Sequence, residues 1–260
     1  MAGPKFEIVC EIEPATRPEL MHVRHQIGVL SPVSTAFLIP DNHIGRATVS
    51  SIAVAHEVRQ MGGRPIACIN ARDRNVLGFR RDLLTAAAYG ITEFLFVYGD
   101  RPETGSRSDD LTVRTMIAEA RAFAERTDVD GSLRIGVATG LGPIPDWKQD
   151  ADFLLTQVSF SAEDLVEWRH TVEFDGPVQA GVLVMASPSM ARKLSADIPQ
   201  LTVPGTIVDR LDRDGDAGVD IACDLIMALR ASEAFDGVHL VPVNRYREMA
   251  ARLETLLLAR

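Results

Sequence analysis

Short runs of apolar residues alternate along the chain with longer segments whose apolar positions recur every three or four residues. Eight of the short runs predict β-strands. Most of these runs are apolar at nearly every position, which is typical of strands covered on both faces. The predicted strands span residues 6–12, 35–40, 64–70, 93–99, 133–139, 152–160, 178–185 and 237–243.

The longer segments predict amphipathic helices between these strands. Two of them begin at good capping residues, Asn75 and Ser161. We expect helices at 46–62, 75–90, 111–127, 161–174, 218–232 and 244–260, with a short one near 188–196. Strand followed by helix around eight strands predicts an α/β fold, namely a (β/α)8 TIM barrel in which residues 1–260 form a single catalytic domain. A doubly wound open sheet is the alternative.

Three irregular segments stand out by length and by their content of Gly, Pro and Asp: 100–110, 140–147 and 199–217. They follow the fourth, fifth and seventh predicted strands. In a barrel such loops lie at the carboxyl ends of the strands, where active sites are found.

Composition narrows the class of protein. Of 260 residues, 46% are hydrophobic, which is enough for one sizeable core. The net charge of -9 argues against nucleic acid or an anionic membrane as a partner. The three cysteines form no CxxC pair, and we expect reduced thiols in a cytoplasmic protein. Neither a signal peptide nor an apolar run of membrane-spanning length is recognisable.

Several familiar chemistries lack their residues. The three lysines do not end strands, which argues against a Schiff-base enzyme. The segment "HEVRQ" (56–60) lacks the second histidine of a zinc protease, and "GLGPIP" (140–145) lacks the third glycine of a dinucleotide fingerprint. Acid–base or redox chemistry on a small molecule, or Mg²⁺ held by carboxylates, remains.

Candidate chemistry is found where the predicted strands end. A buried carboxylate is costly unless it is paired or used, so at least one of Glu11 and Glu13 is expected to be functional. Asp73 lies between two arginines, so a structural ion pair explains it at least as well as catalysis. Gln157 needs polar partners, which a ligand could supply. The set is Glu11, Glu13, Asp41, Asn42, His43, Asp73, Asp100, Gln157, Asn244 and Arg245.

Four segments, taken in order, resemble methylenetetrahydrofolate reductase. The segment 68–102 is the most specific of them. At the family's spacing it contains, in order, a polar strand end, a helix, Gly-Ile, an apolar strand and Gly-Asp-x-Pro. The resemblance covers nearly the whole chain. It implies a (β/α)8 barrel that reduces 5,10-methylenetetrahydrofolate to 5-methyltetrahydrofolate, in one-carbon metabolism and methionine biosynthesis. The segments are "CEIEPATRPEL" (10–20), "CINARDRNVLGFRRDLLTAAAYGITEFLFVYGDRP" (68–102), "DADFLLTQVSF" (150–160) and "GVHLVPVNR" (237–245).

The resemblance also implies roles for single residues. Glu11 takes the place of the general acid that protonates N10 of the folate, and Asp100 that of the acid that grips the pterin. Protonation opens the five-membered ring and leaves an iminium at N5, which accepts hydride. Folate contacts are implied for Gln157 and Arg245, and the strand-end residues Asp41 and Asn244 are further candidates for substrate binding.

Three segments depart from the flavin-dependent pattern of the family: 39–48, Tyr98 and 138–145. All three fall on segments that contact flavin in the family, whereas the pterin-side residues remain. We therefore expect hydride transfer directly from NADH or NADPH, without bound FAD and without a metal. Glu57 becomes a candidate second catalytic carboxylate, although a solvated or salt-bridged helix face is its ordinary explanation.

Three alternatives stay open. One is an FAD-dependent reductase of the same family. Another is a Mg²⁺-dependent C–C lyase that uses the carboxylates of Glu11, Glu13, Asp41 and Asp100. The last is a folate-binding barrel that transfers methyl groups or has no catalytic activity. The sequence fixes neither the oligomeric state nor the choice between NADH and NADPH.

Overall fold

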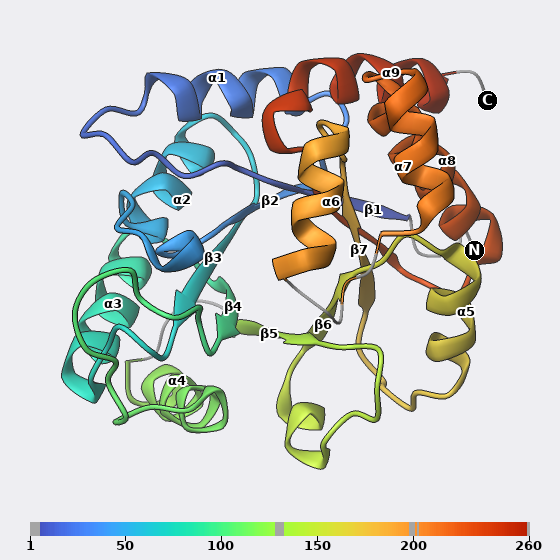
Figure 1. Ribbon diagram of the computed structural model, residues 1–260. Helices are drawn as coiled ribbons and strands as arrows, with labels where there is room; N and C mark the ends of the chain where they lie inside the picture. Colours follow the sequence, from blue (N-terminus) through green and yellow to red (C-terminus); the bar gives the residue numbers. More distant parts are fainter. Residues whose placement is uncertain (1–5, 128–132, 198–200, 202, 259–260) are drawn as a thin grey trace.

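Eight parallel strands close into a barrel in the computed structural model, which describes residues 6–127, 133–197, 201 and 203–258 (Figure 1). Each strand pairs with its neighbours in sequence order, and β1 pairs with β8. All eight predicted strands are confirmed, and so is the single-domain (β/α)8 fold. The open-sheet alternative is wrong. The strands are β1 (Glu7–Glu11), β2 (Ala36–Ile39), β3 (Pro65–Asn70), β4 (Glu93–Val97), β5 (Arg134–Thr139), β6 (Phe153–Val158), β7 (Val178–Leu183) and β8 (Gly237–Val241).

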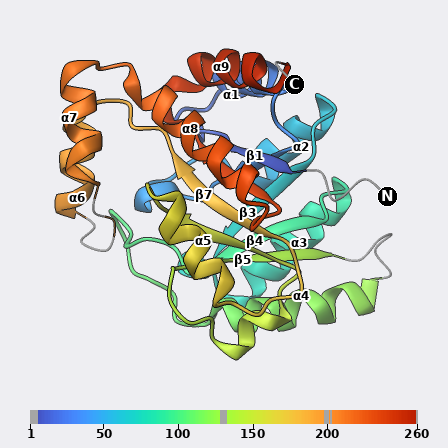
Figure 2. The same cartoon turned by 90° about the vertical axis from the view of Figure 1, so that its right-hand side faces the viewer.

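Helices surround the barrel, and α1 and α9 lie side by side where the ring closes (Figures 1 and 2). None of the helices in the described ranges is both long enough and apolar enough to span a bilayer. The α-helices are α1 (Met21–Leu30), α2 (Ser51–Gln60), α3 (Val76–Ala88), α4 (Val113–Thr127), α5 (Ala162–His170), α6 (Pro188–Asp197), α7 (Gly205–Arg213), α8 (Ala217–Ser232) and α9 (Tyr246–Leu258). Short 3-10 turns are η1 (His43–Gly45), η2 (Asp146–Asp150) and η3 (Val243–Arg245).

The helices differ from the sequence prediction in several places, among them the end of α5 at His170 rather than at residue 174. Helix α1 was not predicted, and α7 lies inside the segment 199–217 that was expected to be irregular. Residues 198–200 and 202 of that region are outside the described part of the chain. Helix α2 begins only at Ser51 rather than at residue 46. The two predicted caps are confirmed, because Asn75 accepts a hydrogen bond from Gly78 N and Ser161 accepts one from Asp164 N.

Alternation along the strands separates two apolar layers. One set of side chains faces the helices, and the other fills the barrel interior. Phe153 reaches into this interior next to Gly136, where an added Cβ would come within 2.2 Å of the Phe153 ring. Glycine at position 136 therefore makes room for the ring. The interior cluster is Val9, Ala36, Leu38, Ile66, Cys68, Leu95, Phe153 and Leu155.

Charged side chains occupy the barrel at the amino ends of the strands. Arg64 binds Glu7 at 2.6 Å and Glu93 at 3.0 Å, and Arg134 binds Glu93 at 2.8 Å. Gln179 donates to Glu7 as well. With this end filled by paired charges and the middle filled by apolar groups, the carboxyl ends of the strands are the place for a ligand.

Candidate active site

Glu11 is the acidic residue that β1 presents at the mouth of the barrel. It lies two positions after Val9 of the interior cluster, and residues two apart on a strand share a face, so the Glu11 side chain points inward. Its Oε2 lies 3.1 Å from Nε2 of His239, and the two side chains are 15% and 11% exposed. The contact with His239 holds the Glu11 carboxyl group in one place at the mouth of the barrel.

His239 is the site residue that the sequence analysis missed. It lies in the middle of β8, opposite Val9 of β1. A signal for it was present, since it is the polar member of the alternating set Gly237, His239 and Val241, which faces the interior. Only closure of β8 against β1 brings its ring to Glu11.

Gln157 also lies at the mouth and is free to bind a ligand. It lies at the carboxyl end of β6, inside the register shift between Leu155 and Val158, and it is exposed. Its side chain has no hydrogen-bond partner within the described ranges. Asn244, in the turn η3 after β8, is likewise exposed. Both positions are compatible with the predicted contacts to substrate.

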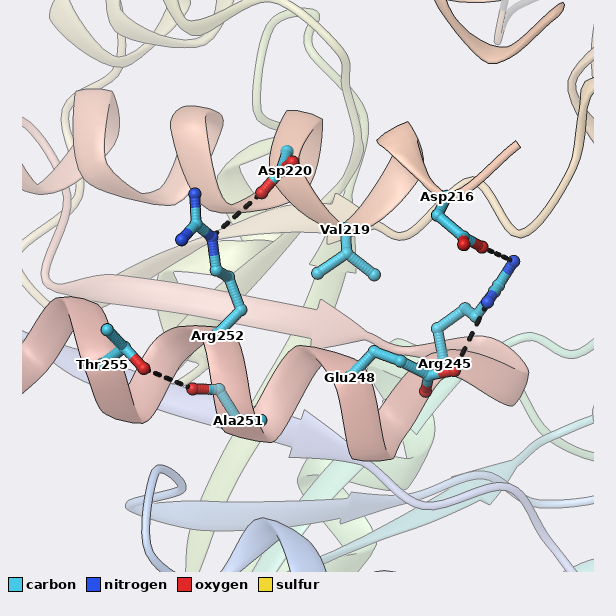
Figure 3. A pocket seen from close by; sticks show the side chains of 8 residues that line it. All are labelled: Asp216, Val219, Asp220, Arg245, Glu248, Ala251, Arg252 and Thr255. Carbon is cyan, nitrogen blue, oxygen red and sulfur yellow. Dashed lines mark hydrogen bonds and ion pairs between the residues drawn. The ribbon is translucent and has the colours of Figure 1, made fainter. Parts of the chain in front are cut away.

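Arg245 lies between α8 and α9, as Figure 3 shows. Its guanidinium binds Asp216 at 2.7 Å and Glu248 at 3.3 Å, at the edge of a pocket of about 430 Å³. In the same pocket Arg252 binds Asp220 at 2.9 Å. These carboxylates are exposed, and exposed pairs contribute little, so a ligand carboxylate could replace them. The predicted contact of Arg245 with folate stays a prediction.

Asp41 follows β2 by two residues, but its carboxylate is buried in the protein, with the side chain 4% exposed. It accepts hydrogen bonds from the backbone N and from Nδ2 of Asn70 at 3.0 and 2.7 Å. It also pairs with Arg74, which binds Asp82 as well, at 2.7 Å. A role in fixing the loop between β3 and α3 fits this burial better than a contact with substrate.

Asp73 is held by a buried arginine, as the sequence analysis allowed. Its two oxygens each lie 2.6 Å from a nitrogen of Arg72, and Asn42 and Asn70 donate to it at 2.8 and 3.0 Å. The hydrogen bonds from Arg72 are the largest cause that lowers the Asp73 pKa from 3.8 to about 2, and burial opposes them. The structural interpretation of Asp73 is therefore the better supported one.

This shift makes stability depend on pH. Because the pKa of Asp73 is lower in the folded state, its contribution is complete above the unfolded value of 3.8 and is lost as the pH falls through about 2. Asp73→Asn removes the contribution at all pH values. Between about pH 6 and about pH 2, the wild-type protein should therefore lose up to ~2 kcal/mol more unfolding free energy than the variant. Urea unfolding of both proteins measures this, and parallel pH profiles would contradict it.

Asp100 follows β4 and is exposed at the mouth, where the loop after β2 contacts it. Oδ2 of Asp100 accepts a hydrogen bond from Ile44 N at 3.1 Å, and Glu103 N donates to Gly45 O at 3.0 Å. Ile44 has φ 56° and its side chain is 63% exposed. A left-handed β-branched residue is strained by about 1–2 kcal/mol, and such strain gathers at binding sites. The two loops thus position Asp100 together.

Glu57 lies on α2 and pairs with Arg24 of α1 at 2.7 Å. The pair joins two helices of the outer ring. Arg24 also lowers the pKa of Glu57 through its hydrogen bond. The salt-bridged helix face, given above as the ordinary explanation, accounts for Glu57, and we do not carry this residue into the proposed mechanism.

The carboxylates required for a magnesium lyase are engaged separately. Glu11 binds His239, Asp41 binds Arg74, and Asp100 binds the backbone of Ile44. Within the described residues, no three or more His, Cys, Asp or Glu side chains are grouped closely enough to hold a metal ion. The geometry therefore does not favour the lyase alternative.

Comparison with known proteins supports the fold. No known protein family matches the sequence, and no curated protein sequence matches it. Among solved structures, an uncharacterized protein from Clostridium thermocellum that binds two copies of 5-methyl-5,6,7,8-tetrahydrofolic acid is 12% identical, with a TM-score of 0.64 over 97% of this chain and 96% of that one.

Two enzymes are also similar in structure. The spore cortex-lytic enzyme SleL of Bacillus cereus is 12% identical, with a TM-score of 0.57 over 96% of this chain and 74% of its own. The β-1,3-glucanosyltransferase of Rhizomucor miehei is 11% identical, with a TM-score of 0.54 over 91% of this chain and 86% of its own. At these identities the likeness establishes the barrel fold alone.

Proposed function

We propose that this protein is a folate-binding barrel enzyme that reduces 5,10-methylenetetrahydrofolate to 5-methyltetrahydrofolate with NADH or NADPH in the cytoplasm. The observation that carries the proposal is the Glu11–His239 pair at the mouth of the barrel. A barrel of similar structure binds 5-methyltetrahydrofolate, which would be the product of this reaction.

The reaction requires a proton donor at one point and a hydride acceptor next to it. Glu11, in its protonated form, would give its proton to N10 of the folate and so break the bond between N10 and the methylene carbon. His239 would hold the acid in place and exchange the proton with it. The iminium left at N5 then takes hydride on its methylene carbon, and the nicotinamide is oxidised.

The remaining mouth residues suit the substrate. Asp100 can accept hydrogen bonds from the pterin and stabilise the cationic intermediate, and Gln157 offers an amide that lacks a partner within the described ranges. Tyr98 is exposed beside Asp100, with the Arg107 guanidinium 4.5 Å from its ring centre. The family carries a flavin-holding arginine at the position of Tyr98, so a reaction without FAD fits this residue.

Purified protein should oxidise NADH only when methylenetetrahydrofolate is present, and should form an equal amount of 5-methyltetrahydrofolate without added FAD. Absorbance at the NADH band and chromatography of the folates measure the two products, with NADPH tested in parallel. Absence of folate-dependent NADH oxidation would contradict the reductase. A stoichiometric flavin band in the visible spectrum of the purified protein would instead support the FAD-dependent alternative.

A further inference from the structure

A cavity of about 540 Å³ lies at the loop between β4 and α4. It contains Asp100 of the candidate site and one side chain from the loop after β3, Arg72. The other walls come from the β4–α4 loop itself. The lining side chains that matter below are Arg72, Tyr98, Asp100, Arg101 and Arg107.

Arg72 has a donor without an acceptor. The residue is 1% exposed, and Asp73 takes its Nε and Nη2. Nη1 is buried and has no hydrogen-bond partner among the described residues. Buried donors in folded proteins are almost always satisfied, so an exception of this kind points to a missing acceptor.

The backbone fixes Arg72 in this position. Its N donates to Tyr98 O at 3.1 Å, and its O accepts from Ser108 N at 2.8 Å. Both partners belong to the segment that follows β4. Arg72 is therefore held where it lines the cavity, and Nη1 is the guanidinium nitrogen that Asp73 does not engage.

The charges around Arg72 decide which kind of acceptor fits. Asp73 already neutralises the guanidinium, and Asp100 is close enough to raise the pKa of Arg72 further. A free anion at Nη1 would face two carboxylates, so a neutral acceptor is favoured. Oδ1 of Asp100, for its part, has no donor within the described ranges, since Ile44 N binds Oδ2.

We propose that this cavity binds the edge of an uncharged amide, with Arg72 Nη1 donating to the carbonyl oxygen and Asp100 Oδ1 accepting from the neighbouring N–H. Such an edge pairs both groups at once. Tyr98 lines the same cavity, and because the Arg107 guanidinium covers one face of its ring, only the other face could stack on a planar ligand ring. Arg72 thereby becomes a residue that determines which ligand is accepted.

Two ligands of the proposed reaction carry this amide edge. The choice of these two ligands rests on the proposed function, whereas the amide-binding site itself does not. One is the pyrimidinone ring of the folate, and the other is the carboxamide of the nicotinamide. Each has a close analogue with an altered carbonyl. The 4-amino analogue of folic acid replaces the oxygen by an amine and also loses the neighbouring ring N–H, so it changes the contacts of both Arg72 and Asp100. The thionicotinamide analogue of NADH replaces only the oxygen, by sulfur, a weak acceptor.

Binding measured by calorimetry tests the proposal with these two pairs. In at least one pair, the wild-type protein should prefer the carbonyl ligand by about 10- to 100-fold, because the analogue leaves the buried Arg72 unpaired. Arg72→Met should reduce the preference in either pair, and to within about threefold in the nicotinamide pair, where only the carbonyl differs. Arg101→Met is the matched control, since this exposed arginine lines the same cavity, and it should keep the preference.

Three results would overturn the proposal: no binding in either pair, no preference of the wild-type protein in either pair, or a folded Arg72→Met variant that keeps the preference. If Arg72→Met does not fold, Asp100→Ala at an exposed position replaces it: the loss of the acceptor for the N–H should weaken binding of the carbonyl ligand by about 3- to 10-fold, and an unchanged affinity would overturn the proposal. If the protein shows the predicted binding preference but does not oxidise NADH with methylenetetrahydrofolate, the result would contradict the proposed function and still support this binding site.

Discussion

Glu11→Gln is expected to lower the rate of methylenetetrahydrofolate reduction by about 10²- to 10⁴-fold, the range typical of losing a general acid. Glutamine keeps the shape and the hydrogen-bonding capacity of the side chain, but it has no acidic proton for N10. Folate binding should therefore stay within about threefold of wild type, because uniform binding and proton transfer are separate contributions. Stopped-flow or steady-state NADH oxidation gives the rate, and fluorescence titration gives the affinity.

Glu13→Gln is the matched control. Glu13 is the next acidic residue after Glu11 and lies just beyond the end of β1, but it is exposed, and only its backbone contacts Gln26. The control variant should retain the wild-type rate. A Glu11→Gln protein that turns over at more than about a tenth of the wild-type rate would show that Glu11 does not supply the proton.

Arg74→Met should lower the free energy of unfolding by about 3–5 kcal/mol, the cost typical of breaking a buried ion pair from one side. Arg74 is the shared partner of Asp41 and Asp82, and all three side chains are largely buried. Methionine fills much of the volume but leaves the buried Asp41 carboxylate without a cation, and leaves Asp82 with only the exposed Arg81. Urea unfolding monitored by circular dichroism measures the loss.

Arg81→Met separates this effect from a general loss of charge. Arg81 contacts the same Asp82 at 2.9 Å, but its own side chain is exposed. Exposed pairs contribute about 0–1 kcal/mol, so this variant should be close to wild type. Equal losses of unfolding free energy in the two variants would mean that burial of Arg74 does not strengthen its ion pairs. Asp41 would then again be a candidate for substrate binding.

Local pattern was sufficient for the strands and for two helix starts. Runs such as 64–70 and 178–185 are apolar on both faces, because helices cover the outside of the barrel and packed side chains fill the inside. Asn75 and Ser161 cap their helices through contacts only three residues away. Such short-range interactions are legible in a single sequence.

Helix α7 escaped prediction for the opposite reason. It has only two buried residues, Ile207 and Leu211, in a segment rich in Asp and Arg. These two pack with Met185 and Ala191 in a small satellite cluster beside the barrel. The apolar signal is therefore short, and the helix is stabilised by contacts that the sequence does not show.

Some residues of the candidate site were also predictable from the sequence, and others were not. Glu11 and Asp100 were selected because they end predicted strands, and the structure places both at the mouth of the barrel. Asp41 met the same criterion, yet Arg74 and Asn70 bury its carboxylate. Position at a strand end does not reveal which neighbour a side chain will find.

By itself, the sequence determined the strand–helix alternation and the strand ends that carry acidic and amide side chains, and it favoured a barrel over the open sheet that only the tertiary structure excluded. These properties depend on the period of apolar residues and on which residue follows each strand. Only the tertiary structure decided that His239 meets Glu11 across 228 positions of sequence, and that Arg72 keeps one unpaired donor beside Asp100. Such contacts depend on barrel closure and on the packing of separate loops, because distances between residues far apart in the chain are set by the whole fold.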